Sequence, residues 1–226
     1  MPTKPVKKID AWSWSRYFDY ITCPLKAKYK HVDKLKEPGN TAMQRGNDIH
    51  KEAEDYTKGL IKTLPASLKL FKKEFADLKK RHPAVERQDA FDSTWSHLGA
   101  DGWFSKLAWL RVKMDAQYFD LKPREIVVID HKTGKMRDGY EEQLGLYAAA
   151  DIQLVQGATA VRTQLWYLDE GEIVEQKFSF DDAKDLQKEW TKKVKPMFAD
   201  ARFAPRPNDK CRFCHFRKSN GGPCKY

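Results

Sequence analysis

In the first third of the chain, hydrophobic residues recur every three or four positions, which is the period of a helix with one buried face. This pattern predicts helices over residues 13–31, 42–59 and 66–81. The last of these carries Leu68, Phe71, Phe75 and Leu78 as an apolar stripe among lysines, which indicates a face packed on the core. The first third of the chain is therefore expected to be helical.

The middle of the chain changes to a two-residue alternation, the period of a strand. It predicts strands near 84–92, 108–119 and 125–131, with a loop around residues 99–102 between the first two. The connection 120–124 is short, polar and contains Pro123, so the second and third strands should form an antiparallel hairpin. Such a hairpin would bring Asp115 near Asp130 at one end of the sheet.

The last third predicts a helix over 140–150, a hairpin of strands 160–168 and 172–180, and a helix over 181–198. This order implies an α/β (α+β) fold in which helices flank a mixed central sheet. A chain of 226 residues is long enough for one domain with a sizeable core. We expect a single domain over 1–226, with a basic lead at 1–10 and a cysteine-containing tail at 205–226.

The chain is basic, with 42 Lys and Arg against 32 Asp and Glu and a formal net charge of +10. A lysine-rich solvated surface could produce this excess without any partner. An excess of positive charge also suits a polyanionic partner, because phosphate contacts dominate affinity for nucleic acids. No apolar run approaches the roughly 18 to 20 residues that span a bilayer, so no membrane segment is expected.

Candidate chemistry lies at the end of the third predicted strand, where an apolar run delivers Asp130 and Lys132 just before Thr133-Gly134. Alternation places both side chains on one face of the strand and His131 on the other. A carboxylate and an ammonium held together suit hydrolysis assisted by a hard cation, although an ion pair at a strand end is the simpler interpretation. Asp115 on the neighbouring strand adds a second acid and favours a cation site.

Two helical pairs complete the pattern. Gly46 and His50 lie four residues apart in the 42–59 helix, and Gln143 and Tyr147 lie four apart in the 140–150 helix. The order Gly46-xxx-His50, Asp115, Asp130-x-Lys132, Gln143-xxx-Tyr147 resembles the RecB-like branch of the PD-(D/E)XK nucleases. The opening Ser13-Trp14-Ser15 and Cys23-Pro24 are also similar to the first helix of that branch.

That resemblance implies a role for each of these residues. Asp115, Asp130 and His50 would bind Mg²⁺ or Mn²⁺, and Lys132 would act on the attacking water. Gln143 and Tyr147 would support the site or contact substrate. Glu86 stands where relatives often carry another strand acid, but an exposed strand residue is an equally good interpretation.

The four cysteines are Cys23 and three in the tail, Cys211, Cys214 and Cys224. With so few thiols and no secretory signal, a disulfide framework is disfavoured and a reducing, cytoplasmic compartment is expected. Four thiolates can complete one metal site, either an iron-sulfur cluster or zinc, with His215 as a substitute zinc ligand. The arrangement is similar to iron-sulfur members of the RecB-like branch, such as the AddB nuclease domain and CRISPR-associated exonucleases, and this resemblance implies a 4Fe-4S cluster.

The expected function is a metal-dependent DNA nuclease, most simply an exonuclease acting on linear ends or single strands. Two alternatives stay open: a structure-selective endonuclease, and a noncatalytic zinc-containing nucleic-acid-binding module. Trp95, Trp103 and Trp109 could stack on unpaired bases, although aromatic residues at this density are more often core. A chain of this length has no room for a helicase motor, so coupling to unwinding would need a protein partner, and a homo-oligomer is equally open.

Overall fold

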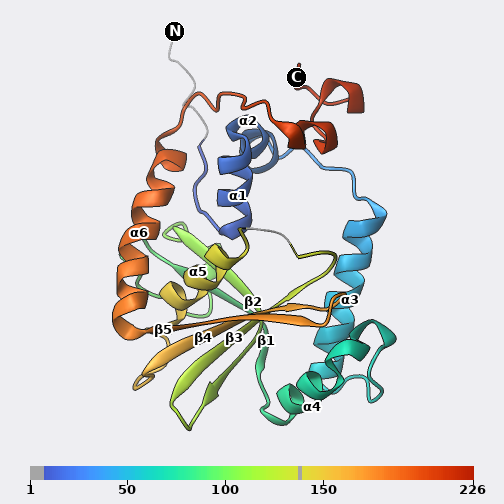
Figure 1. The fold of residues 1–226 in the computed structure, drawn as a ribbon. Coiled ribbons are helices and arrows are strands. Elements are labelled where there is room, and N and C mark those ends of the chain that lie inside the picture. The colour runs from blue at the N-terminus through green and yellow to red at the C-terminus, as the bar shows by residue number, and fades with distance from the viewer. Residues whose placement is uncertain (1–7, 137–138) are drawn as a thin grey trace.

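The computed structural model describes residues 8–136 and 139–226 (Figure 1). Within them a five-stranded sheet has the order β1-β2-β3-β4-β5. The strands are β1 (Ala84–Phe91), β2 (Leu110–Asp120), β3 (Glu125–Lys132), β4 (Ala160–Tyr167) and β5 (Glu172–Ser179). Pairing is antiparallel except between β3 and β4, which are parallel and are joined through a helix, as parallel neighbours require. The predicted strands and the mixed sheet are confirmed.

The central strand β3 is apolar on both faces because helices cover both sides of the sheet. Ile126 and Val128 pack into the core on one face, and Val127 and Ile129 pack into the core on the other. A run without alternation is the expected sequence of such a strand.

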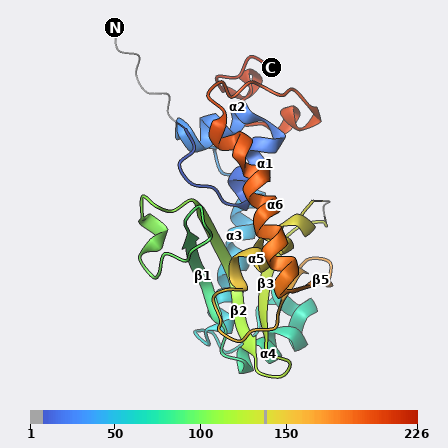
Figure 2. The ribbon, with the colours of Figure 1, turned by 90° about the vertical axis from the view of Figure 1, so that its left-hand side faces the viewer.

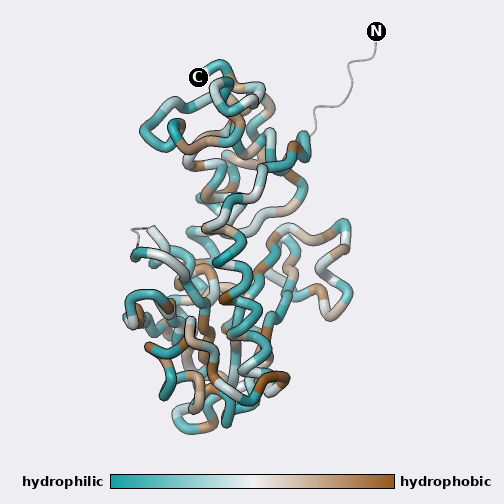
Figure 3. The backbone as a smooth tube through the Cα atoms, turned by 90° about the vertical axis from the view of Figure 1, so that its right-hand side faces the viewer, coloured by the Kyte–Doolittle hydropathy of each residue, from teal (hydrophilic) through white to brown (hydrophobic). Residues whose placement is uncertain are grey.

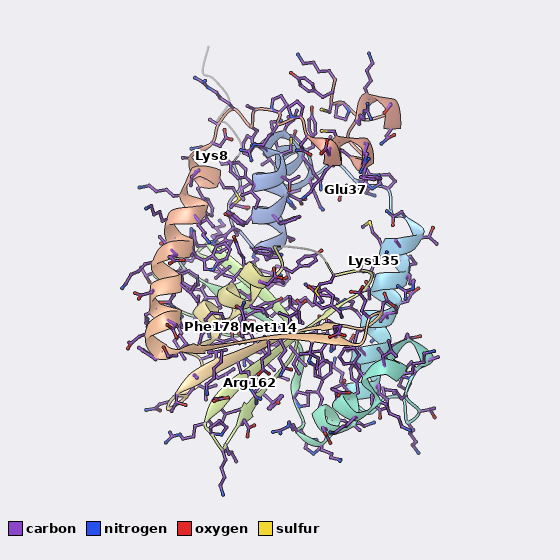
Figure 4. The ribbon with its side chains drawn as sticks, in the orientation of Figure 1. Lys8, Glu37, Met114, Lys135, Arg162 and Phe178 are labelled. Carbon is purple, nitrogen blue, oxygen red and sulfur yellow. The ribbon has the colours of Figure 1, made fainter. Side chains whose placement is uncertain are left out.

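One face of the sheet is covered by α5 (Glu141–Asp151) and α6 (Phe180–Ala199), and α1 (Trp14–Thr22) packs against α6 in the same core. Trp12 and Trp190 are almost completely buried there, with ring centroids 5.4 Å apart. Met114 of β2 and Phe178 of β5, labelled in Figure 4, belong to the same packed layer. Ser179 begins α6 through a capping box with Asp182, which satisfies backbone groups of the first turn.

The opposite face is covered by α3 (Thr41–Thr57), a 3₁₀ segment (Ala66–Phe71) and α4 (Lys72–Lys80). The predicted helix over 66–81 is thus α-helical only in its second half, because residues 66–71 follow Pro65 in a tighter turn. Its apolar stripe is confirmed as core: Phe71 stacks on Trp166 at 5.4 Å, and Phe75 packs edge-on against the same ring at 5.3 Å.

The predicted helix over 13–31 is divided into three pieces. Cys23 is extended between α1 and α2 (Pro24–Ala27), and a π-helical turn follows at Lys28–Val32. The break arises at Pro24, which has no N–H to continue the first helix and disfavours helical backbone in the residue before it. The C-terminal tail lies beside this segment at one end of the molecule (Figures 1 and 2).

Two further expectations concern the basic lead at residues 1–10 and the absence of a membrane-spanning segment. Of the basic lead 1–10, residues 1–7 lie outside the described residues. Hydrophilic and hydrophobic positions are mixed along the helices in Figure 3, and no helix of the described chain is both long and apolar enough to cross a bilayer.

Candidate functional site

The candidate site lies where two neighbouring strands separate. Pairing of β2 with β3 ends at Ala116 and Ile129, so Asp115 and Asp130 are the first residues beyond the last pair. β3 continues along β4 as far as the pair Lys132–Tyr167. The backbone groups that would otherwise bind the adjacent strand are freed at this fork, which leaves room for side chains from both faces.

Asp130 and Lys132 form an ion pair on the α5 side of the fork. The Lys132 Nζ also donates a hydrogen bond of 2.9 Å to Gln143 Oε1, and Gln143 Nε2 donates one of 3.2 Å to Asp130 Oδ1. Gln143 is therefore oriented, because its oxygen faces the ammonium and its nitrogen faces the carboxylate. The three residues form a closed polar network at the end of β3.

Tyr147, one turn after Gln143 on α5, completes this network by donating its hydroxyl hydrogen to Asp130. Burial raises the pKa of Tyr147 well above its usual value, and the negative charge of Asp130 raises it further. The phenol therefore stays protonated and remains a donor. The i, i+4 spacing predicted for Gln143 and Tyr147 is confirmed as one face of a helix.

On the other side of the fork, Asp115 lies between two histidines. His50 Nδ1 is 3.4 Å from Asp115 Oδ1, and His131 Nδ1 is 3.7 Å from Asp115 Oδ2. The His131 backbone N–H donates to the same Oδ2 at 2.6 Å. Burial raises the pKa of Asp115, but the hydrogen bond from His50 and the two histidines outweigh it and lower the pKa to about 2. Asp115 is thus an ionised acceptor at neutral pH.

Gly46 permits the close approach of α3 that delivers His50. A Cβ added at Gly46 would lie 3.1 Å from Thr133 Oγ1, directly after the end of β3. One helical turn later, His50 reaches Asp115. Burial lowers the pKa of His50, but the hydrogen bond and charge of Asp115 leave it above its ordinary value.

His131 occupies an unexpected position. Alternation predicts that it points away from Asp130 and serves in packing, and its ring is indeed buried against Phe75 and Trp166. Yet it also lies beside Asp115, since Asp115 is on the His131 side of the fork rather than the Asp130 side. Met114 packs into the core on one face of the sheet and Ala116 into the core on the other. Residues two apart in a regular strand share a face, so β2 is irregular here and simple alternation does not predict the direction of Asp115.

The predicted ligands are therefore divided between two clusters. Among the described residues, His50, Asp115 and His131 have ligand atoms within 4.8 Å of one another, and Asp130 is not in that group. Asp130 is held with Lys132, Gln143 and Tyr147. Glu86 forms an ion pair with Lys113 and belongs to neither cluster. We call the seven residues His50, Asp115, Asp130, His131, Lys132, Gln143 and Tyr147 the fork site.

The fork site contains carboxylate oxygens, the donors that a hard divalent cation prefers. Asp115 and Asp130 supply carboxylate oxygens, and His50 supplies an imidazole nitrogen. Asp115 is ionised, and the Asp130 carboxylate has a neighbouring ammonium that balances its charge. These residues fit a magnesium- or manganese-type cation better than a soft one, because no thiol is among them.

A second cluster gathers the thiols. Cys23, Cys211, Cys214 and Cys224 all line one cavity of about 880 Å³, which we call the cysteine cavity. All four are free and partly exposed. The tail reaches them by docking on α1: Asn208 Nδ2 donates to the Thr22 carbonyl at 3.1 Å, and the Arg206 backbone N–H lies 3.4 Å from Cys23 Sγ.

The end of the tail folds back to bring the last thiol to the same cavity. The Cys224 N–H donates to the Phe216 carbonyl at 2.8 Å, and the Lys218 N–H donates to the Cys224 carbonyl at 2.8 Å. Phe216 packs on Tyr29 of the π-helical turn, with ring centroids 5.4 Å apart. The thiol of Cys23 and the three thiols of the tail, almost the whole chain apart in sequence, thus line the same cavity.

Comparison with known proteins agrees with this geometry. The sequence matches the profile of the PD-(D/E)XK nuclease superfamily over residues 11–219. No curated protein sequence matches it.

Among solved structures, a protein from Eubacterium rectale described as a candidate exonuclease superposes with a TM-score of 0.53 at 14% identity, over 92% of this chain and 88% of that one. The crystal structure of SSO0001 gives a TM-score of 0.47 at 19% identity, over 98% of this chain and 90% of that one. At such identities the Eubacterium rectale protein supports the fold alone. Because the matched segment extends from just before α1 into the cysteine tail and includes every residue of the fork site, the chain belongs to the PD-(D/E)XK nuclease superfamily.

Proposed function

We propose that this protein is a Mg²⁺- or Mn²⁺-dependent deoxyribonuclease that acts as an exonuclease, with residues 1–226 forming one nuclease domain. The observation that carries the proposal is the Asp130–Lys132 pair at the end of β3, held by Gln143 and Tyr147 and adjoining Asp115 across the fork. A simple structural ion pair has no need of a second ionised acid and a histidine beside it.

In this proposal Asp115, Asp130 and His50 hold the cation. When bound, the ion would polarise the phosphate and supply a water of lowered pKa. Asp130 holds the Lys132 ammonium in place, and Lys132 orients the attacking water or stabilises the negative charge that develops on the phosphate oxygens. Gln143 and Tyr147 hold the Asp130 carboxylate in one orientation and exclude other hydrogen-bond partners from it.

The substrate class follows from the family and the charge. A nuclease domain acts on nucleic acid, and the formal net charge of +10 favours a polyanion. The Eubacterium rectale structure of the same fold is described as a candidate exonuclease, and we extend that activity to this chain as an analogy of fold. We place the protein in a reducing, cytoplasmic compartment because its thiols are free.

We further propose that the four cysteines bind a 4Fe-4S cluster with a structural role. Tetrahedral zinc at about 2.3 Å from each thiolate would need sulfur atoms about 3.8 Å apart. In the described residues no three cysteine sulfurs lie within 4.8 Å of one another, although all four line the same cavity. In a 4Fe-4S cluster each thiolate binds a different iron atom, so its four sulfurs need not lie as close together as those of a zinc site.

The nuclease proposal is tested with end-labelled linear DNA and closed circular DNA, each incubated with Mg²⁺, Mn²⁺ or EDTA. We expect metal-dependent loss of the linear substrate alone, and its abolition in Asp130→Asn but not in Glu189→Gln, which alters an exposed acid of α6. Cutting of circles would make the enzyme an endonuclease. Binding without cleavage in every metal would leave a noncatalytic binding module.

The cluster proposal is tested by purification without oxygen, followed by iron, sulfide and zinc analysis. We expect a brown protein with about four iron and four sulfide per chain. One zinc per chain in a colourless protein would refute it.

A further inference from the structure

A second cavity, of about 460 Å³, adjoins the fork site. Lys132, Gln143 and Tyr147 form one wall of it. The other walls come from residues 12–16 at the start of α1, residues 111–113 of β2, and Trp103 of the loop between β1 and β2. We call it the Arg111 cavity. None of the roles proposed above uses its remaining walls.

The Arg111 cavity carries more positive than negative charge. Lys132 is paired with Asp130 and Lys113 with Glu86. Arg111 forms no ion pair with any acid in the described part of the chain, and its buried Nε has no hydrogen-bond partner. The cavity is therefore lined by a guanidinium that no carboxylate of the described residues neutralises.

Arg16 adds to this excess. Burial lowers the pKa of Arg16, and the positive charge of Arg111 lowers it further, so the two guanidiniums lie close enough to repel. The counterion of Arg16 is Asp10, 3.7 Å away, whose side chain is 84% exposed. Two partly buried cations with so little compensation are stabilised by a bound anion, and a guanidinium pairs well with phosphate oxygens.

Trp103 supplies an aromatic surface at the same place. Its ring lies 5.9 Å from the Arg111 guanidinium. The other two tryptophans considered for stacking are used in the core: Trp95 is 5% exposed, and Trp109 packs on Trp12 at 5.4 Å. Trp103 is only half-buried and is followed by Phe104, which is 87% exposed. Of these three tryptophans, Trp103 is the one that lines the Arg111 cavity.

We propose that the Arg111 cavity is a subsite for one unpaired nucleotide of the DNA strand, next to the phosphate that is cleaved. Arg111 and Arg16 bind the phosphate of that nucleotide, and Trp103 stacks on its base. The volume lies in the lower part of the range for small-ligand sites, about 300–1,000 Å³, which suits one nucleotide rather than a base pair. The proposal rests on the nuclease function and narrows its substrate to single-stranded DNA or a frayed end.

The test measures binding rather than cleavage, so that the two proposals can fail separately. Wild type, Arg111→Gln and Trp103→Leu are titrated in EDTA against fluorescein-labelled oligothymidine and against a labelled duplex of the same length. Arg202→Gln and Phe180→Leu, at exposed positions away from the cavity, serve as matched controls.

We expect Trp103→Leu to weaken binding of the single strand by about 5- to 150-fold, the usual range for one stacked base, and to leave duplex binding unchanged. Arg111→Gln should reduce the slope of log affinity against log salt for the single strand by about 0.7, the value for one phosphate contact. Trp103→Phe should restore most of the affinity, which separates stacking from a folding defect.

Equal weakening of single-strand and duplex binding by Trp103→Leu, or an unchanged salt slope in Arg111→Gln, would refute the subsite. If these effects appear but wild type cleaves nothing in any metal, the subsite stands and the nuclease proposal fails. If wild type cleaves but the substitutions leave binding unchanged, the nuclease proposal stands and the subsite fails.

Discussion

Lys132 Nζ donates a hydrogen bond of 2.9 Å to Gln143 Oε1, which joins the last residue of β3 to the first turn of α5. The amide nitrogen of the same glutamine donates to Asp130 Oδ1 at 3.2 Å. One side chain therefore positions both members of the ion pair. The packing of α5 on the sheet thus determines the geometry of the fork site.

Gln143→Leu is expected to lower the cleavage rate about 10- to 100-fold, the usual effect of removing a residue that orients metal ligands. Leucine keeps the apolar packing but leaves Lys132 without this acceptor and Asp130 without this donor. Because Gln143 acts through other residues, the loss should fall on kcat more than on KM. Steady-state cleavage of a linear substrate measures both, with Gln88→Leu on the exposed side of β1 as control. An unchanged kcat would show that Gln143 serves packing alone.

His50→Ala is expected to raise the Mn²⁺ concentration needed for half-maximal binding by about 10-fold or more, since one ligand is removed from the cation. The replacement also removes the hydrogen bond to Asp115. Manganese titration followed by electron paramagnetic resonance measures this without reference to activity. His82→Gln, at an exposed position after α4, is the matched control. Equal manganese affinity in wild type and His50→Ala would show that His50 is not a ligand of the cation.

Cys211→Ser is expected to lose iron and to lower Tm by about 5–10 °C. A cross-link that closes a long loop contributes a few kcal/mol, and 1 kcal/mol shifts Tm by about 2–4 °C for a domain of this size. Cys23 lines the same cavity although it lies near the other end of the chain, so Cys23→Ser should also lose iron and lower Tm. Iron analysis and a thermal melt under nitrogen make the comparison, with Ser219→Ala in the same tail as control. Full iron content in Cys23→Ser would show that the tail binds iron without the N-terminal segment.

Asp151→Asn is expected to remove a pH dependence of stability. The carboxyl is fully buried, with Oδ1 unpartnered, and burial together with the charge of Asp89 raises its pKa to about 7 from an ordinary value of 3.8. At a pH between these two pKa values, the Asp151 carboxyl is protonated in the folded chain and ionised in the unfolded chain. Stability from this group is therefore present below about pH 4, falls as pH rises towards 7, and is lost above it.

The loss across that window should be a few kcal/mol, because each pKa unit corresponds to about 1.36 kcal/mol. Asparagine can still accept the hydrogen bond that Gln117 donates to Asp151. Urea unfolding at pH 5, 6, 7 and 8 measures the effect, and Asp181→Asn at an exposed position of α6 is the control. The same pH slope in wild type and Asp151→Asn would assign the dependence to another group.

Much of the fold could be predicted from the sequence because it depends on local patterns. The apolar run 125–131 predicts a strand, and the short connection after Asp120 predicts the hairpin, both of which the structure confirms. The i, i+4 pair Gln143 and Tyr147 depends only on helical geometry. The sequence order of the motifs likewise predicts the superfamily, which the profile match confirms.

Only the tertiary structure decided which side chains meet. Asp115 joins His50 and His131 because β2 is irregular where it leaves β3, and no period in the sequence marks that point. Trp103 lines the cavity while Trp95 and Trp109 pack against other aromatic rings, although all three lie near the predicted strands. Periodicity fixes which way a side chain points within its own element, whereas its partners depend on where distant elements pack and separate.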